Sequence, residues 1–210
     1  DTAGGFMARK ISAFGMELVG GAAPQLRIDT DALPLVLLPT FMLLGAVLGV
    51  LGLAFNKTLV MALDWRTKAF ARMPFVYPIL VGAAVGVLAF VLPMAVGGGE
   101  TLIPDLPLAN LPIQTLLLLA VVRFVGTMAS YPAGVPSGIF SPMLTLATTV
   151  GLIFGLLVEM ALVRSPLAVP PLVAAAFAVA AMGGLFSSTI RAPLVGVVLV
   201  VELTGAFELI

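Results

Sequence analysis

The sequence predicts an all-α polytopic membrane protein, and three observations support this class. Of its 210 residues, 61% are hydrophobic and 10% are charged, compared with about 45–50% apolar and about 25% charged residues in an ordinary soluble domain. The uncharged run from Ala32 to Phe55 exceeds the roughly 18 residues that mark a spanning helix. Further long apolar runs follow it, so we expect several crossings of the membrane.

The first half of the chain is expected to begin with a short segment and a long helix. Segment 4–21 is apolar but is interrupted by two basic residues, so it is expected to be an interfacial helix or a helix end. A long helix is predicted at about 35–63, and we predict the basic stretch 64–72 to be a loop. The positive-inside rule places that loop on the cytoplasmic side, with Trp65 at the headgroup level.

Five further helical segments are predicted after this loop, separated by connectors rich in Gly and Pro. They cover residues 75–96, 113–130, 141–163, 170–190 and 192–210. We expect the last two to be short for full spans. The connector 97–112 contains three glycines and two carboxylates, and it is expected to form a loop or a short helix on the far side.

Three Gly-x-x-x-Gly pairs are expected to mark helix contacts. Small residues spaced in this way let helix backbones approach closely in a membrane, where no hydrophobic effect drives the helices together. The pairs are Gly45 with Gly49, Gly82 with Gly86, and Gly151 with Gly155.

The composition excludes several classes of function. The chain has no cysteine and no histidine, which rules out disulfides, thiolate metal sites and the usual proton shuttle. Net charge is zero and there is no basic run, so nucleic acid is not expected as a partner. An intramembrane protease would need a base beside Ser137 or two carboxylates on facing spans. Neither arrangement is expected, because the chain has no histidine and its aspartates lie in connectors: Asp29, Asp31, Asp64 and Asp105. We therefore predict that the protein is not an enzyme and that it uses no cofactor and no metal.

The stretch YPAGVPSGIFSPML, residues 131–144, breaks the apolar pattern with three prolines and two glycines. A helix is predicted to begin around Gly138 to Ser141, because proline is favoured in a first helical turn and Pro142 follows directly. The first amides of a helix have no acceptor within it, and the positive end of its dipole favours an anion. No Lys or Arg lies in the stretch. This suits a conduction path, because a transported ion must be bound weakly enough to leave the site again. The alternative is a surface loop in which the Pro and Gly residues only form turns.

The segment GVPSGIFSP resembles the anion-binding motif of the CLC family of chloride channels and chloride/proton antiporters, through Gly138, Phe140 and Pro142. The resemblance implies an inverted-repeat fold of tilted and broken helices, with this chain covering the second repeat and the last helix of the first. Residues 1–210 would then be a partial transmembrane domain that lacks the N-terminal half and the last helix. Five further blocks occur in the order that the family shows: 44–57, 96–103, 121–127, 182–204 and 207–210.

The resemblance also implies how an anion is held. The backbone amides of Ile139 and Phe140 would bind the central chloride, and Gly138 would let the backbone approach the ion. Ser137 stands where many relatives have Gly, and its hydroxyl would cap the helix start. The family's gating and proton-transfer glutamates and its serine and tyrosine ligands find no match in residues 1–210. Passive conduction and chloride/proton exchange therefore both stay open, as do another small anion such as fluoride or nitrate and a non-conducting assembly subunit.

The partners implied by the resemblance are chloride, the lipid bilayer and a second copy of the protein. The homodimer would form through segments corresponding to about Phe6–Met16 and Ala192–Val201. The protein would be a multi-pass integral membrane protein, in the cell (inner) membrane if its source is prokaryotic. Because the first residue is Asp1, we expect the chain to be a fragment.

Four charges lie inside or beside apolar runs. A charge at a lipid-exposed helix centre costs roughly 2.5–3.5 kcal/mol on insertion scales. We therefore expect these side chains to face protein or water, as structural pairs, near the interface or along an ion path: Arg123, Glu159, Arg191 and Glu202.

Overall fold

The computed structural model describes residues 37–73, 75–96, 111–134, 138–162 and 173–204, and within these ranges every regular element is helical. Among the described residues, four segments are long and apolar enough to cross a membrane. This agrees with the predicted all-α, polytopic class. The α-helices are α2 (Leu38–Ala69), α3 (Val76–Val91), α4 (Ile113–Ser130), α5 (Phe140–Leu162), α6 (Val173–Ile190) and α7 (Pro193–Thr204), with short 3₁₀ turns η3 (Pro93–Ala95) and η5 (Tyr131–Ala133).

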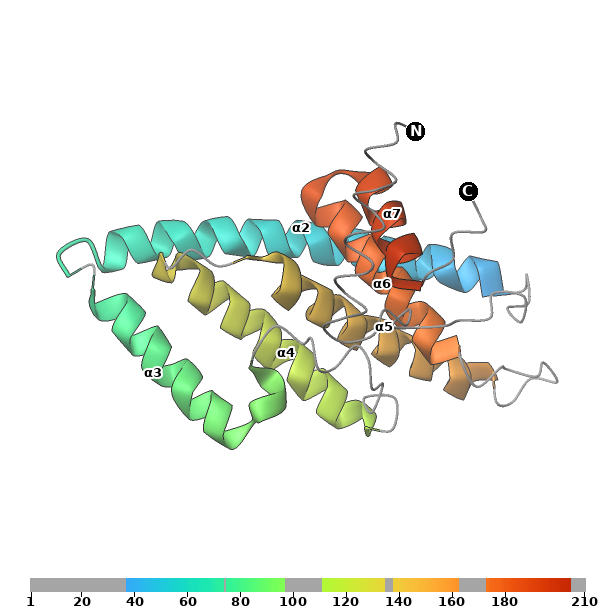
Figure 1. The fold of residues 1–210 in the computed structure, drawn as a ribbon, viewed down its shortest axis with the longest axis horizontal. Coiled ribbons are helices and arrows are strands. Elements are labelled where there is room, and N and C mark those ends of the chain that lie inside the picture. The colour runs from blue at the N-terminus through green and yellow to red at the C-terminus, as the bar shows by residue number, and fades with distance from the viewer. Residues whose placement is uncertain (1–36, 74, 97–110, 135–137, 163–172, 205–210) are drawn as a thin grey trace, which may run out of the picture.

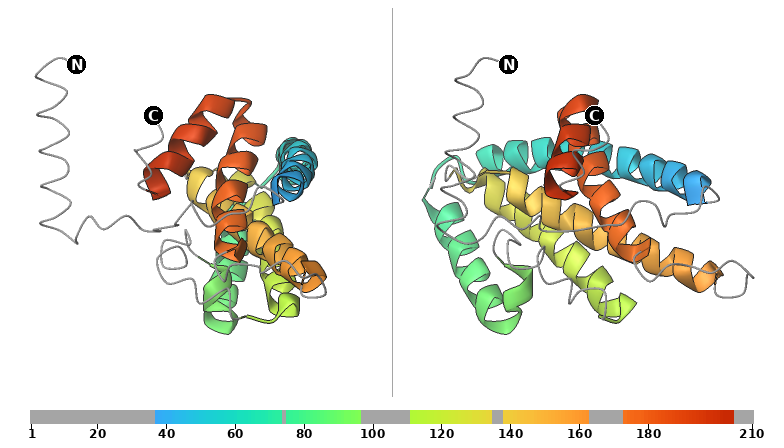
Figure 2. Two further views of the ribbon diagram at one scale, coloured as in Figure 1. Left: turned by 90° about the vertical axis from the view of Figure 1, so that its right-hand side faces the viewer. Right: turned by 45° about the vertical axis from the view of Figure 1, so that its right-hand side comes forward.

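The central helix is α6, which packs against α5, α2 and α7. Helix α4 packs against the other face of α5, and α3 lies at the edge of the bundle beside α4 (Figure 1). Figure 2 shows α2 along one side of the bundle and α7 folded back beside α6. The largest fully buried side chains include Phe55 of α2 and Phe177 of α6, so the core lies where α2, α5 and α6 meet.

Two predictions about the helices need correction. The basic stretch 64–72 is not wholly a loop, because α2 continues to Ala69 and only the residues after it turn. Nothing between Leu63 and Ala69 breaks a helix, and backbone hydrogen bonding does not depend on where the hydrocarbon ends. Helix α6, which we expected to be short for a full span, has 18 described residues and is apolar enough to cross, whereas α7 has only 12 residues.

The three glycine pairs differ in what they face. A Cβ built on Gly151 would lie 2.5 Å from the Phe177 carbonyl oxygen and 2.6 Å from the Ala178 Cα, and one on Gly155 would lie 2.6 Å from the Ala174 Cα. This pair therefore marks the predicted close contact, between α5 and α6. The other two pairs are exposed and meet no atom within 4 Å in the described part of the chain.

The charges in or beside apolar runs have different surroundings. Arg123 is 5% exposed and so faces protein, as expected. Glu159 is half-buried. Arg191 is exposed at the corner between α6 and α7 and has a left-handed backbone, with φ of 60°. The side chain of Glu202 lies outside the described residues.

Candidate functional site

The start of α5 lies within the range that the sequence predicts. Helix α5 begins at Phe140, inside the predicted range, and the amide of Met143 donates to the carbonyl oxygen of Ile139 at 3.1 Å. Among the bonds between described residues, this is the first backbone hydrogen bond at the start of the helix. In the described part of the chain, the amides of Ile139 and Phe140 donate to no backbone carbonyl. Two donors and the positive end of the helix dipole therefore point out of the first turn.

The start of α5 lies beside the middle of α2 rather than at the end of the bundle. The ring of Phe140 packs edge-on against Phe186 of α6, with centroids 5.3 Å apart. Two residues further along α6, the Ser188 hydroxyl donates to the Leu48 carbonyl oxygen of α2 at 3.1 Å. Figure 1 shows α5 beginning part-way along α2, after the chain has left the end of α4. The first turn of α5 therefore lies part-way along a helix that is long enough to cross a membrane.

The chain reaches this position by reversing after α4. The η5 turn follows α4 directly, and Gly134 then adopts a left-handed conformation, with φ of 79° and ψ of 11°. Glycine takes this conformation without the steric cost that a Cβ brings. The reversal lets α5 start next to the C-terminal half of α4 instead of continuing away from it.

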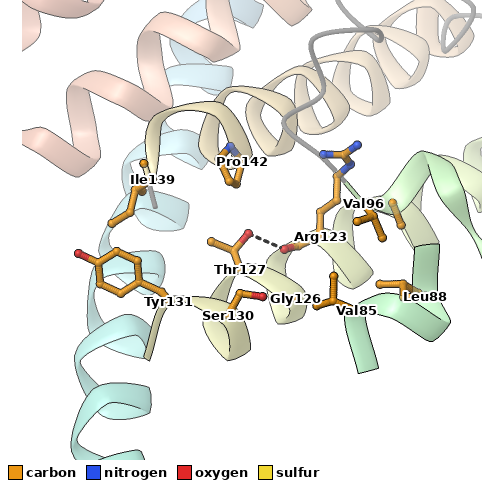
Figure 3. A pocket seen from close by; sticks show the side chains of 12 residues that line it. Val85, Leu88, Val96, Arg123, Gly126, Thr127, Ser130, Tyr131, Ile139 and Pro142 are labelled. Atoms are coloured by element: carbon orange, nitrogen blue, oxygen red, sulfur yellow. Dashed lines mark hydrogen bonds between the residues drawn. The ribbon is translucent and has the colours of Figure 1, made fainter. Parts of the chain in front are cut away.

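A cavity of about 220 Å³ lies beside this helix start (Figure 3). A water molecule occupies about 30 Å³ in the liquid, so the cavity has room for a small ion with several waters. Its wall is formed by α3, η3, α4, η5 and the residues around the start of α5. The lining residues are Val85, Leu88, Ala95, Val96, Arg123, Gly126, Thr127, Ser130, Tyr131, Gly138, Ile139 and Pro142.

Arg123 brings a positive charge to the wall of this cavity. Its Nη2 donates to the carbonyl oxygen of Met94 in η3 at 2.6 Å, and Figure 3 shows its side chain extending between Pro142 and Val96. The hydroxyl of Thr127 donates to the Arg123 carbonyl oxygen at 2.8 Å. The stretch 131–144 carries no cation of its own, but the fold places one next to it.

The predicted site residues are only partly brought together. Gly138 and Ile139 line the cavity, and a Cβ on Gly138 would meet no atom of the described residues within 4 Å. The Phe140 side chain does not line it, because the ring turns towards Phe186. Its amide belongs to the same first turn as that of Ile139. Ser137 lies outside the described residues.

The α4 contribution to the cavity was not predicted from the sequence. Relative to Arg123, the residues Gly126, Thr127 and Ser130 follow at three, four and seven positions, which places all four on one face of a helix. That spacing was a usable signal for a polar face on an otherwise apolar helix. What the spacing could not indicate was that this face meets the start of α5.

The helices define the class of protein: it is an integral membrane protein, whose described residues include four apolar helices long enough to span a bilayer. A profile of the family described as voltage gated chloride channel matches residues 3–210. The chain therefore belongs to the voltage gated chloride channel (CLC) family.

Individual relatives agree with this assignment. The chain is 39% identical over 173 residues to the H(+)/Cl(-) exchange transporter ClcA of Vibrio parahaemolyticus, an alignment that covers 81% of this chain and 36% of that protein. It is 35% identical over 206 residues to ClcA of Salmonella paratyphi A, covering 95% of this chain and 42% of that protein. A crystal structure of a slow cyanobacterial Cl-/H+ antiporter superposes with a TM-score of 0.73 at 30% identity, covering 90% of this chain and 44% of the other. The chain thus spans less than half the length of these relatives.

Proposed function

We propose that this chain is part of a chloride transporter and that the first turn of α5 binds the transported anion. The observation that carries the proposal is the pair of amides at Ile139 and Phe140, which open the helix beside the middle of α2. An anion there would satisfy donors that lipid cannot satisfy, and an unsatisfied amide in hydrocarbon costs several kcal/mol. Gly138 allows close approach of the backbone, and Ser137 would cap the helix.

The surroundings of the amides support an anion as the occupant. Arg123 lines the adjoining cavity, and the described lining residues include no carboxylate. A buried positive charge raises the local concentration of anions and is screened less than a surface charge. Because Arg123 already donates to Met94, we expect it to act on the anion through its field.

The names of the relatives favour exchange of chloride for protons as the form of transport, since these proteins are called exchange transporters or antiporters. We infer that this chain forms part of a longer transmembrane domain, because it spans 36–44% of those relatives. In an inverted-repeat transporter the substrate site lies between the repeats. One half then supplies only one wall of the pathway. The bacterial relatives favour the cell membrane as its location.

We infer that the complete protein forms a homodimer in which α7 contributes to the interface. Four of its apolar side chains are 48–79% exposed in the described structure, and a two-fold dimer is the commonest closed assembly. The other segment implied by the resemblance, Phe6–Met16, lies outside the described residues. The exposed side chains are Leu194, Val195, Val197 and Val198.

The test of the anion site is a backbone amide-to-ester substitution at Phe140 in the complete protein. The ester removes one N–H donor and keeps the side chain, so it separates the amide from the ring. A hydrogen bond to a charged group contributes about 1.5–3 kcal/mol, so we expect chloride affinity in calorimetry to fall by roughly tenfold to a hundredfold.

The matched control is Phe140→Leu, which changes the ring and keeps the amide. It should weaken chloride binding less than the ester does, although it removes the contact with Phe186. A second control places the ester at Thr148, inside α5, where the amide points into the helix. If the ester variant at Phe140 binds chloride with the same affinity as the unmodified protein, this amide does not bind the ion.

A further inference from the structure

The last residues of α2 and the turn that follows them, residues 64–73, are together called the turn between α2 and α3, and they concentrate positive charge at the end of a spanning helix. Arg66, Lys68 and Arg72 lie within seven residues, and Asp64 is the one carboxylate of this turn. The chain as a whole has equal numbers of basic and acidic residues. Lys68 and Arg72 are exposed, and Arg66 is half-buried. With three basic residues and one acidic residue, the turn has a net charge of +2, so the other residues of the chain sum to −2.

Large apolar side chains are exposed among these cations. Trp65 is 57% exposed, Met73 65% and Phe75 79%. Tryptophan is favoured at the membrane–water interface, where its ring can contact both apolar and polar groups. Cations interleaved with exposed aromatic side chains are typical of segments that lie in the headgroup region. The combination fits a lipid surface better than it fits a small soluble anion, which would leave these apolar groups in water.

The turn is held in a fixed shape. Trp65, Phe70 and Tyr77 form a ring cluster, with centroid distances of 5.8 Å for Trp65–Phe70, 6.1 Å for Trp65–Tyr77 and 5.2 Å for Phe70–Tyr77. The hydroxyl of Tyr77 donates to the carbonyl oxygen of Ala129, near the end of α4, at 2.7 Å. The cluster therefore ties the turn to α4. Because the backbone is already ordered, presenting the cations to a ligand costs less conformational entropy than ordering a flexible loop would.

We propose that the turn between α2 and α3 binds the headgroups of anionic phospholipids. Arg66, Lys68 and Arg72 contact the phosphates, while Trp65 and Phe75 insert beside the glycerol and upper acyl region. A basic residue near an anionic leaflet strengthens association about fivefold. The charge and the exposed rings together select phosphatidylglycerol over a zwitterionic lipid of the same chain length.

The test uses Trp65 as a local probe, since it is the single tryptophan of the chain. The complete protein is reconstituted in phosphatidylcholine vesicles that contain either brominated phosphatidylglycerol or brominated phosphatidylcholine at equal mole fraction. Bromine quenches tryptophan on contact, and the Trp65 signal is the difference between the wild type and Trp65→Phe. We expect stronger quenching by the brominated phosphatidylglycerol at low ionic strength. Equal quenching by the two lipids would overturn the proposal.

The charge requirement is tested with a triple variant, Arg66→Gln with Lys68→Gln and Arg72→Gln. It should lower the preference for phosphatidylglycerol by at least about fivefold. The matched control is Arg191→Gln, which removes an exposed cation at the corner between α6 and α7 and should leave the preference unchanged. An unaltered preference in the triple variant, or an equal loss in the control, would overturn the proposal.

Two titrations on the wild type keep the test independent of how well the triple variant folds. Raising the salt concentration from 10 mM to 1 M shortens the screening length from about 30 Å to about 3 Å, and it should reduce the preference. Inorganic phosphate at constant ionic strength should have no effect on it. A preference that survives high salt, or one that phosphate abolishes, would contradict a site for anionic lipid headgroups.

Discussion

The contact between α5 and α6 gives a sharp prediction, because it depends on the absence of one side chain. Replacing Gly151 by alanine adds a Cβ that would lie 2.5 Å from the Phe177 carbonyl oxygen, 2.6 Å from the Ala178 Cα and 2.7 Å from the Ala181 Cβ. Two of these three atoms belong to the backbone of α6. No rotamer change can remove such overlaps, so the two helices must move apart.

The size of the effect follows from two opposing contributions. Overpacking a well-packed interior costs about 1–3 kcal/mol, and overlap with backbone atoms puts Gly151→Ala near the upper end. Alanine also favours a helix over glycine by about 1 kcal/mol. We therefore expect a net destabilisation of about 2 kcal/mol, which lowers the ratio of folded to unfolded protein about thirtyfold.

The assay measures the thermal stability of the complete protein in detergent. Samples are heated, and size-exclusion chromatography then measures how much folded protein remains. Gly45→Ala is the control, since it makes the same change at an exposed position of α2 with no described atom within 4 Å. The control should be as stable as the wild type or slightly more stable. If Gly151→Ala were no less stable than Gly45→Ala, the close approach of α5 and α6 would be wrong.

Three further outcomes follow from the described contacts and the proposed assembly. Tyr77→Phe removes the hydrogen bond to the Ala129 carbonyl oxygen and should lower stability in the same heating assay by about 1 kcal/mol; an unchanged midpoint would mean that this bond is not made. Val197→Trp, on the exposed face of α7, should shift the protein towards monomers in light scattering, and an unchanged mass would count against α7 as the interface. Residues 1–210 alone should show no chloride flux in loaded vesicles, since one half of an inverted repeat supplies one wall of the pathway; flux equal to that of the complete protein would contradict this.

The helices could be predicted from the sequence because their signals are local. Long apolar runs predict spans, and Pro142 with the preceding glycine predicts where α5 begins. The end of α2 was harder to predict, since its charged residues are also good helix formers. Charge can indicate where the hydrocarbon ends, but it does not stop the backbone from continuing as a helix to Ala69.

Contacts between helices were less predictable, because identical patterns meet different neighbours. Gly45 with Gly49 and Gly151 with Gly155 have the same spacing, yet only the second pair faces another described helix closely. In the same way, the position of Arg123 beside the start of α5 depends on the reversal at Gly134. The sequence could therefore indicate the chemistry of the helix start but not the cavity next to it.

The most direct measurement of the anion site is the position of a heavier halide in a crystal of the complete protein. Bromide replaces chloride in the crystallisation medium, and its anomalous scattering identifies the ion without reference to the protein chain. We expect an anomalous peak within hydrogen-bonding distance of the amide nitrogens of both Ile139 and Phe140, at the first turn of α5. Ordered bromide at other positions in the pathway, with none at this turn, would contradict the proposed function of these amides.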